Sequence, residues 1–362
     1  MICLSGGLSV ACDNKKHHDR LIIVEIGAKE SLPASSTLPH AEAAVAENTV
    51  VFSDEMHISD IRQVEKYITW LIEFRGFERI LLDFTHCRTV FSESMIPLVC
   101  YVLERQHEGV VFSLRLPVYE RLRRLFVNCG WAHLIAPKQI RDPGQAVGDN
   151  IPLLRFTDQS EQDEIVNLSV NQLLKTLSFV TRDDLRALEW SVNEICDNVL
   201  NHSLSEIGGL FQFNLLRFSR EVEFVVADAG IGIPNSLRSI ENKGWSDEFA
   251  LEQSIKQGVT RDPKFGQGNG LFGTYQIAAL SGGTFHINSG EAHLVVTRQG
   301  EVQVRHDQDK FRGTMVLCAI NFTKPELLER ALSFKGGNYR MVDMLELRYE
   351  VDDDTLKFAL IN

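Results

Sequence analysis

Asp228-Ala-Gly-Ile-Gly-Ile-Pro234 follows directly on the apolar run 222–227, which the sequence predicts to be a buried strand. A carboxylate at the end of such a strand, followed by two glycines, lets the backbone approach a flat ligand closely. The Asp228 carboxylate can accept a hydrogen bond from an exocyclic amine, which is one way to recognise an adenine ring. A glycine-rich turn between a strand and a helix is the alternative interpretation.

A helix with a polar line is predicted upstream of this turn. Thr181-Arg-Asp-Asp184 has capping-box spacing, and apolar residues follow it at intervals of three or four. Glu194, Asn198 and His202 are spaced to lie along one line of that helix. A carboxamide oxygen can bind Mg²⁺, and a carboxylate one turn away can orient or deprotonate a water molecule near a phosphate. A solvated polar helix face is the alternative.

A third segment, Gly266-Gln-Gly-Asn-Gly-Leu-Phe-Gly273, leads into a predicted helix over 274–280. Glycines at every second position leave several backbone N–H groups able to point at one anion, and the helix N-terminus adds its dipole. The segment lacks the Gly-Lys-Ser/Thr of a P-loop, and it does not open a first strand–helix unit as the dinucleotide fingerprint does. It predicts a phosphate site of another kind, with a ligand-free loop as the alternative.

In their order and spacing, these segments resemble the GHKL superfamily of ATP-binding domains, whose members include gyrase, the large heat-shock chaperone, histidine kinases and mismatch-repair ATPases. The resemblance covers residues 174–322. The family's motifs are matched by 194–202 (N box), 228–232 and 266–270 (the two glycine boxes) and Gly313-Thr314 (the final Gly-Thr signature). Residues 270–288 are especially similar to the branch that contains histidine kinases and anti-sigma-factor kinases.

The resemblance implies a role for each matching residue. Glu194 would be the catalytic carboxylate, Asn198 would coordinate Mg²⁺, and Asp228 would accept a hydrogen bond from the adenine amino group. Thr314 would support that last contact through a water molecule. The glycines would make room for the base (Gly230 and Gly232) or present amides to the phosphates (Gly266, Gly268 and Gly270).

The resemblance also implies an ATP lid, formed by residues 235–265. Arg261 and Lys264 are the cations in this segment nearest to a γ-phosphate, whose oxygens such side chains bind well. Ordinary surface charges are the alternative interpretation of both residues. The lid is expected to have contacts to the γ-phosphate as its only strong anchors.

Residues 49–135 show alternating helix and strand patterns, which predict an α/β layer domain. The predicted elements are a helix with apolar residues at 61, 64, 68 and 71, a strand at 79–84, a helix at 94–104, a strand at 110–116 and a helix at 117–126. This order resembles the STAS domain of anti-sigma-factor antagonists. Ser92 lies nearest to that family's regulatory serine, but Phe91 replaces the usual preceding Asp. An N-cap for a helix starting near Glu93 is the favoured interpretation of Ser92.

The chain is expected to divide into five parts: 1–48 with a strand at 21–26 and an irregular segment, the STAS-like domain 49–135, a Pro- and Gly-bearing linker 136–162, the GHKL ATP-binding domain 163–323, and a C-terminal extension 324–362 with a helix and one or two strands. Alternating patterns at 294–297 and 301–305 predict a hairpin added within the ATP-binding domain. With the two resemblances, the fold class is α/β: a STAS-like α/β layer domain followed by a GHKL (Bergerat-type) α/β sandwich.

The composition is that of an ordinary globular protein, with 362 residues of which 44% are hydrophobic and 24% charged. The formal net charge of −12 disfavours non-specific binding to nucleic acid or to anionic lipid. Charged residues interrupt every apolar run before the roughly 18 residues that a membrane span needs. The seven cysteines are scattered and form no Cys-x-x-Cys pair, which favours reduced thiols and a cytoplasmic protein.

These features favour an enzyme: a regulatory or signalling protein that binds Mg-ATP and either hydrolyses it or phosphorylates a protein partner, like an anti-sigma-factor kinase. The STAS-like domain would be its interaction module. The protein could also form a homodimer, and the sequence does not decide this. The alternatives are an ATP-gated clamp of the gyrase or chaperone type and a module that binds nucleotide without catalysis. Intact Glu194 disfavours the last, because degenerate ATP sites usually lose the catalytic carboxylate before the binding groups.

Overall fold

The computed structural model of the chain describes residues 2–4, 8–10, 48–239, 244–259, 269–323, 332–335 and 338–341. The chain divides into two compact units, Met1–Gly144 and Gln145–Asn362. This division falls inside the segment 136–162. Both units combine helices with strands, so the α/β class expected from the sequence is confirmed. Among the described residues, no helix is long and apolar enough to cross a membrane.

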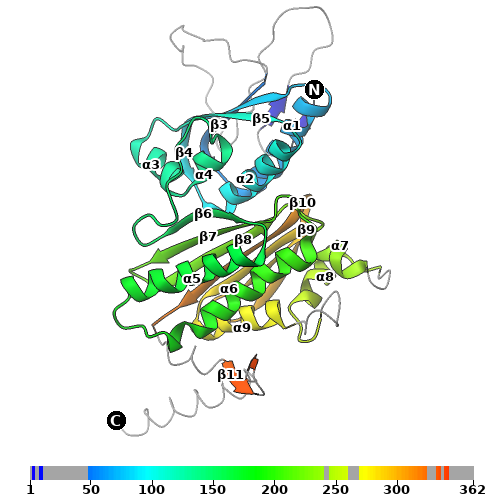
Figure 1. Ribbon diagram of the computed structural model, residues 1–362. Coiled ribbons are helices and arrows are strands. Elements are labelled where there is room, and N and C mark those ends of the chain that lie inside the picture. The colour runs from blue at the N-terminus through cyan, green and yellow to red at the C-terminus, as the bar shows by residue number, and fades with distance from the viewer. Residues whose placement is uncertain are drawn as a thin grey trace, which may run out of the picture. The chain divides into compact units, whose positions relative to one another are not determined.

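The first unit is built around a parallel sheet of three strands in the order β3-β4-β5 (Figure 1). Its elements, in chain order, are β3 (Thr49–Met56), α1 (Ile58–Glu73), β4 (Arg79–Val90), α2 (Ser92–His107), β5 (Val111–Arg115), α3 (Glu120–Asn128) and α4 (Trp131–Ile135). The apolar positions that predict α1 are each at most 1% exposed: Ile61, Val64, Ile68 and Leu71. The rings of Phe52 and Phe84 stack with centroids 4.0 Å apart, so β3 and β4 share one core.

Strand β3 has no counterpart among the elements predicted from the sequence. Its residues alternate only at first, and Asp54 has a positive φ of 52°. The pairing register between β3 and β4 shifts twice along the strand. Such irregularities break the two-residue period on which a strand prediction depends. Before this strand, β1 (Ile2–Leu4) and β2 (Leu8–Val10) form a short antiparallel pair, and the strand expected at 21–26 lies outside the described residues.

The start of α2 differs from the expectation for Ser92. Helix α2 begins at Ser92 itself, and Phe91 occupies the N-cap position. The capping hydroxyl belongs to Ser94, whose Oγ accepts a hydrogen bond from the Phe91 N–H at 3.4 Å and donates one to the Met56 carbonyl at 3.0 Å. The assignment of Ser92 as the N-cap is therefore wrong, because a buried hydroxyl two residues later bonds that amide and ties α2 to the end of β3.

The second unit is a two-layer arrangement of helices on an antiparallel sheet, with the strand order β6-β7-β8-β10-β9. The strands are β6 (Ile151–Phe156), β7 (Gly209–Leu216), β8 (Glu221–Asp228), β9 (Thr284–Val296) and β10 (Val302–Asn321). Three helices lie against one face of this sheet in Figure 1: α5 (Gln159–Thr176), α6 (Arg186–Asn198) and α9 (Gly270–Ser281).

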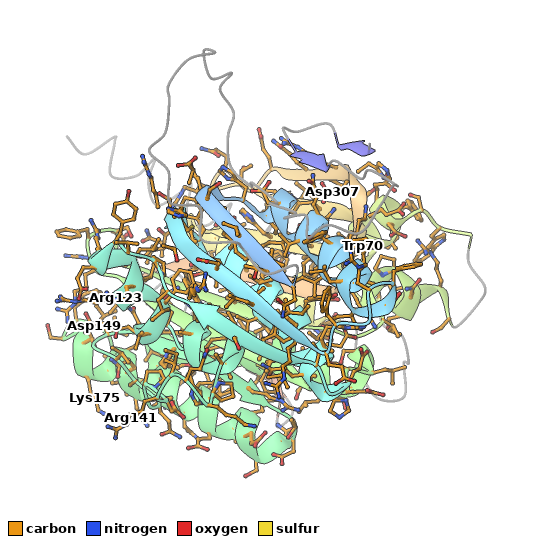
Figure 2. The ribbon with its side chains drawn as sticks, turned by 90° about the horizontal axis from the view of Figure 1, so that it is seen from above. Trp70, Arg123, Arg141, Asp149, Lys175 and Asp307 are labelled. Atoms are coloured by element: carbon orange, nitrogen blue, oxygen red, sulfur yellow. The ribbon has the colours of Figure 1, made fainter. Side chains whose placement is uncertain are left out.

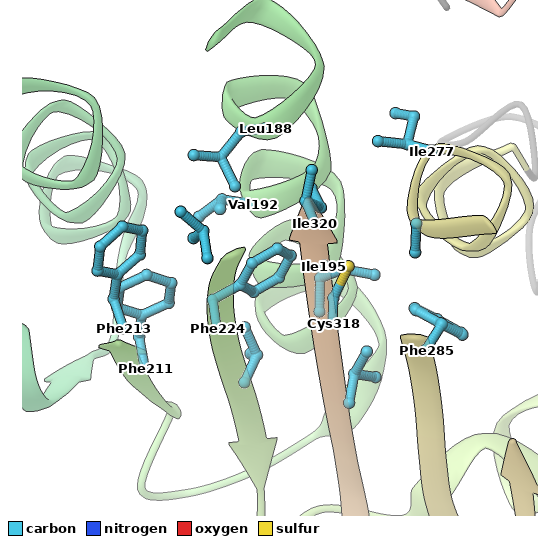
Figure 3. Close-up of a cluster of buried hydrophobic side chains, with 14 of the residues drawn as sticks. Leu188, Val192, Ile195, Phe211, Phe213, Phe224, Ile277, Phe285, Cys318 and Ile320 are labelled. Carbon is cyan, nitrogen blue, oxygen red and sulfur yellow. The ribbon is translucent and has the colours of Figure 1, made fainter. Parts of the chain in front are cut away.

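The core of the second unit lies between α6 and the sheet (Figure 3). Leu188, Val192 and Ile195 project from one stripe of α6 and are at most 2% exposed. They face the fully buried rings of Phe213 and Phe224 on β7 and β8. Burying each large apolar side chain stabilises the fold by roughly 1.5–3 kcal/mol. The three-to-four-residue period of α6 thus fixes which face of this helix points away from the core.

The expected linker 136–162 is too long at its C-terminal end. Strand β6 and the first turn of α5 both lie within it. Ile151 and Phe156 on β6 are completely buried, so this strand belongs to the core of the second unit. Pro152 suggested a linker from the sequence, but β6 is at the edge of the sheet, where a missing N–H is tolerated.

The hairpin expected around residues 294–305 is confirmed as a continuation of two long strands. Val296 on β9 pairs with Val302 on β10. The turn between them closes with a hydrogen bond of 2.8 Å from the Gly300 N–H to the Thr297 carbonyl. In the C-terminal extension, β11 (Leu332–Lys335) pairs with β12 (Asn338–Met341), as the expectation of one or two strands requires. The helix expected in 324–362 lies outside the described residues.

Candidate functional site

Glu194 and Asn198 lie on the last two turns of α6. The helix is preceded by the predicted capping interaction, in which the Asp184 carboxylate accepts hydrogen bonds from the Thr181 N–H and hydroxyl, both at 2.7 Å. After Asn198 the backbone continues as a π-helical turn over Val199–Ser203. This turn is wider than an α-helical turn, so the α-helical spacing that predicts a line of Glu194, Asn198 and His202 does not apply after Asn198.

Asp228 is the last residue of β8 and is 4% exposed. Its Oδ1 accepts a hydrogen bond of 2.8 Å from the Gly230 N–H, and Thr314 lies opposite it in the pairing of β8 with β10. Burial raises the pKa of Asp228 to about 7, although hydrogen bonds from the backbone of Gly230 and Thr314 lower it in part. Among the described residues, no cationic side chain pairs with this carboxylate.

Gly230 is required where the turn after β8 meets the end of the π-helical segment. The Ile231 N–H donates a hydrogen bond of 2.8 Å to the Ser203 carbonyl. A Cβ atom added at Gly230 would collide with that same carbonyl oxygen. The first glycine box is therefore fastened to the segment that follows Glu194 and Asn198, which brings the two motifs together.

Gly232 also has a packing role in the protein itself. Its φ is 78°, and an added Cβ would lie 2.8 Å from the Ser289 Oγ and 2.9 Å from the Gly313 carbonyl oxygen. The space that the sequence analysis assigned to an adenine base beside Gly230 and Gly232 is, in the Cβ direction, filled by the chain's own atoms. Packing within the protein thus explains why both positions are glycine. That an adenine base approaches this turn from another direction stays a prediction.

Ser289 is a site residue that the sequence analysis missed. It is completely buried on β9, and its Oγ donates to the Gly313 carbonyl at 2.8 Å while accepting from the Ile233 N–H at 2.9 Å. The same oxygen lies 3.2 Å from the Thr314 hydroxyl. One hydroxyl therefore joins the first glycine box to the Gly-Thr turn. The sequence gives little signal for it, because β9 carries other polar residues as well, including the buried Asn288 directly before Ser289.

Glu194 meets the second glycine segment at Gly270, the first residue of α9. A Cβ added at Gly270 would lie 2.6 Å from the Glu194 Oε2, so only a glycine leaves this carboxylate its place. Burial raises the pKa of Glu194 to about 7, with a smaller contribution from the charge of Asp197. Asp197 itself accepts a hydrogen bond of 2.8 Å from the Gln162 side chain on α5.

Four of the predicted phosphate-site residues lie outside the described residues: Arg261, Lys264, Gly266 and Gly268. Within the described residues, no group of three or more His, Cys, Asp or Glu side chains is placed to hold a metal ion. Asn198 as a ligand of Mg²⁺ stays a prediction. Mg²⁺ commonly binds through one or two protein oxygens, substrate phosphates and water.

The expected lid, 235–265, contains elements with their own anchors. Helix α7 (Gly232–Arg238) and helix α8 (Asp247–Ser254) are joined by an ion pair between Arg238 and Asp247. Asp247 also accepts a hydrogen bond of 2.7 Å from the Glu291 N–H on β9. The expectation that γ-phosphate contacts are the only strong anchors of the lid is therefore wrong, because the Arg238 side chain on α7 and the Glu291 N–H on β9 hold α8 through Asp247. The part of the lid at 260–265 lies outside the described residues.

The described site consists of two adjoining clusters. One holds Asp228, Thr314 and the first glycine box, and the other places Glu194 against Gly270. The Ser203–Ile231 hydrogen bond connects the helical segment of the second cluster with the turn of the first. Comparison with protein-family models finds no match, and comparison with curated proteins finds no significant relative.

Proposed function

We propose that the second unit binds Mg-ATP and uses it to phosphorylate a protein partner or to release phosphate, as a GHKL-type signalling ATPase or kinase. One observation carries this proposal. Asp228 is a nearly buried carboxylate with no cationic partner among the described residues. Burying an unpaired carboxylate destabilises a fold, and residues with strongly shifted pKa values concentrate at functional sites.

In this proposal Asp228 accepts a hydrogen bond from the adenine amino group, and Thr314 supports the contact through water. The Asp228 Oδ1 already accepts a hydrogen bond of 2.8 Å from the Gly230 N–H. The carboxylate can still accept a further hydrogen bond, which suits the adenine amino group as a donor. An exocyclic amine is a neutral donor that fits a semi-buried acceptor without bringing a second charge into the core. The first glycine box would fix the carboxylate in this orientation.

Glu194 and Asn198 would act on the phosphates. Asn198 would supply one oxygen to Mg²⁺, which neutralises phosphate charge when bound. Glu194 would orient or deprotonate the attacking group, and its pKa near 7, raised by burial, suits a general base at neutral pH. Gly270, together with the predicted Gly266, Gly268, Arg261 and Lys264, would provide the phosphate contacts.

The first unit is proposed to be a STAS-like interaction module. Its parallel sheet β3-β4-β5 with α1 and α2 is compatible with that assignment. Ser94, and not Ser92, supplies the capping hydroxyl of α2, and this proposal includes no phosphorylation of Ser92.

The test is to incubate the purified full chain with γ-labelled ATP and Mg²⁺ and to follow label into free phosphate and protein. Nucleotide affinity is measured in parallel by calorimetry on wild type, Asp228→Asn and the control Asp163→Asn, whose side chain is exposed on α5. We expect Asp228→Asn to lose binding by on the order of 1–3 kcal/mol and the control to match wild type. Equal affinity in all three proteins would refute the adenine assignment, and binding without release or transfer of label would leave only a nucleotide-binding module.

A further inference from the structure

The charge of the chain is distributed unevenly. Residues 111–141 contain six cationic side chains and only one acidic side chain, Glu120, whereas the whole chain has a net charge of −12. The cationic residues are Arg115, Arg121, Arg123, Arg124, Lys138 and Arg141. A basic surface on an acidic protein creates a local positive potential that attracts anionic partners. Half of these cations lie on a single helix, α3.

Helix α3 presents both cationic and apolar side chains to solvent. Its inward side is formed by Leu122 and Phe126, which are buried. On the outward side, Arg121, Arg124 and Leu125 follow one another at helical spacing, and Arg123 also projects from the unit in Figure 2.

Two further apolar side chains immediately precede the helix. Val118 is 66% exposed and Tyr119 is 48% exposed, while Leu125 within α3 is 38% exposed. We name Val118, Tyr119, Arg121, Arg124 and Leu125 the α3 patch.

The contacts within the unit do not use up the cations of this patch. Glu120 accepts a hydrogen bond from the Arg124 Nε at 2.8 Å and pairs with Arg123 as well. The Arg124 side chain is still 73% exposed, so its other donors face solvent. Arg121 has no acidic partner among the described residues. Exposed pairs of this kind stabilise a fold little, so folding alone does not explain the cluster.

We infer that the α3 patch binds an acidic segment of a partner protein that also carries apolar side chains. Arg121 and Arg124 would bind carboxylates, for which guanidinium groups are suited by their paired donors. Val118, Tyr119 and Leu125 would cover the apolar side chains of the same segment. Tyrosine and arginine, both present in the α3 patch, are enriched in protein interfaces. A polyanion such as nucleic acid would engage the arginines but would leave these apolar side chains in water.

This inference does not depend on the proposed ATP function, because no residue of the α3 patch belongs to the second unit. Binding of the acidic segment is therefore expected with and without nucleotide. If Asp228→Asn loses nucleotide binding, its binding of the acidic segment should still match that of wild type.

The probe is a fluorescent 20-residue peptide of Glu and Leu in which the leucines recur at helical spacing. A second peptide has serine in place of leucine, and binding of both to the full chain is followed by fluorescence anisotropy. We expect the Glu-Leu peptide to bind more tightly, and Arg121→Glu/Arg124→Glu to weaken it about tenfold or more. Leu125→Ser should weaken the Glu-Leu peptide and leave the Glu-Ser peptide unchanged.

The matched control is Arg79→Glu/Arg305→Glu, which makes the same change in net charge at two exposed residues outside the α3 patch. It should bind the Glu-Leu peptide like wild type. If the charge reversal on α3 prevents folding, Arg121→Gln/Arg124→Gln provides the same comparison with smaller changes. An equal loss in the control would overturn the inference. So would tighter binding of 20-nucleotide single-stranded DNA or phosphatidylserine vesicles, or a patch-dependent self-association that excludes the peptide.

Discussion

Two carboxyl groups, Asp228 and Glu194, have unusually high pKa values in the folded chain. Burial raises the pKa of each to about 7, well above the ordinary value of an acidic side chain. The folded state therefore keeps these protons in a pH range where the unfolded state has released them. The protonated carboxyl groups therefore contribute to the free energy of unfolding below about pH 4, and this contribution is lost as the pH rises through 7. Above pH 7, the buried charges of these two carboxylates therefore destabilise the ligand-free protein.

Asp228→Asn should stabilise the free protein relative to wild type more at pH 8 than at pH 5. At pH 5 the wild-type carboxyl is largely protonated and resembles the amide, whereas at pH 8 its buried charge destabilises the fold. Thermal unfolding of both proteins at the two pH values measures this difference. A difference in midpoint that does not change with pH would contradict the buried, unpaired state of this carboxylate.

Glu194→Gln should keep ATP affinity and reduce turnover by about 100-fold or more, the range expected for loss of a general base. Glutamine preserves the packing against Gly270, which a larger change would disturb. In wild type, turnover should rise as the pH increases through about 7, because only the deprotonated carboxylate acts as a base. Steady-state rates between pH 5.5 and 8.5 test both statements. Wild-type turnover in the variant would remove Glu194 from the chemistry.

Ser289→Ala should lower the free energy of unfolding by about 1–3 kcal/mol, because it leaves the Gly313 carbonyl and the Ile233 N–H without the Ser289 hydroxyl. We also expect weaker nucleotide binding, since this hydroxyl positions the turn beside Thr314. Urea denaturation and calorimetry give the two quantities. Ser239→Ala is the control, because Ser239 is exposed and its hydroxyl bonds the Ser236 carbonyl within the same helical segment.

At the scale of elements, the long hairpin of β9 and β10 supports α8. Asp247 at the start of α8 contacts Arg238 from α7 and the Glu291 N–H from β9. The Glu248 Oε1 also lies 2.8 Å from the His306 Nδ1 on β10. The hairpin thus holds α8, which lies within the segment 235–265 that the resemblance assigns to an ATP lid. Any movement of α8 over a nucleotide would have to break these contacts.

Asp247→Ala should increase hydrogen exchange within 247–254 about tenfold or more, because α8 loses the polar contacts that Asp247 makes to α7 and β9. Exchange in β7 and β8 should stay the same. Mass-spectrometric hydrogen exchange without nucleotide measures both regions, and Glu252→Ala is the matched control on the exposed side of α8. Unchanged protection in Asp247→Ala would mean that other contacts hold the helix.

At the scale of the whole molecule, the chain consists of two units with separate sheets. The second unit includes β6, whose Ile151 and Phe156 are completely buried. The unit therefore begins before residue 151, although the Pro- and Gly-bearing sequence suggests a linker up to residue 162. The edge position of β6 explains how this strand accommodates Pro152.

A chain that starts at Gln145 should fold and unfold cooperatively, whereas one that starts at Asp163 should not. The shorter chain lacks Ile151, Leu153 and Phe156, which are at most 3% exposed. Burial of each contributes roughly 1.5–3 kcal/mol, against a total stability of about 5–15 kcal/mol for a typical domain. Urea denaturation followed by circular dichroism compares the two chains. Cooperative unfolding of the shorter chain would show that β6 is dispensable.

The sequence by itself determined the elements whose pattern is local. The period of Leu188, Val192 and Ile195 predicted α6 and its buried face, and the alternation around residues 294–305 predicted the hairpin of β9 and β10. The apolar run that ends at Asp228 predicted β8 and the turn after it. These predictions succeeded because helix and strand periods depend on neighbours within a few residues. Where a bulge or an edge proline disturbs the period, in β3 and β6, the sequence pattern was insufficient.

The tertiary structure alone decided how the site is assembled. Ser289 bonds Gly313 across 24 residues, and the Glu291 N–H bonds Asp247 across 44. The glycines at 230 and 232 were recognised from the sequence, but the atoms that require them, at Ser203 and Ser289, come from other elements. The raised pKa of Asp228 likewise arises from burial by the surrounding fold. Such properties depend on chain segments that only folding brings into contact, and no local pattern of residues encodes them.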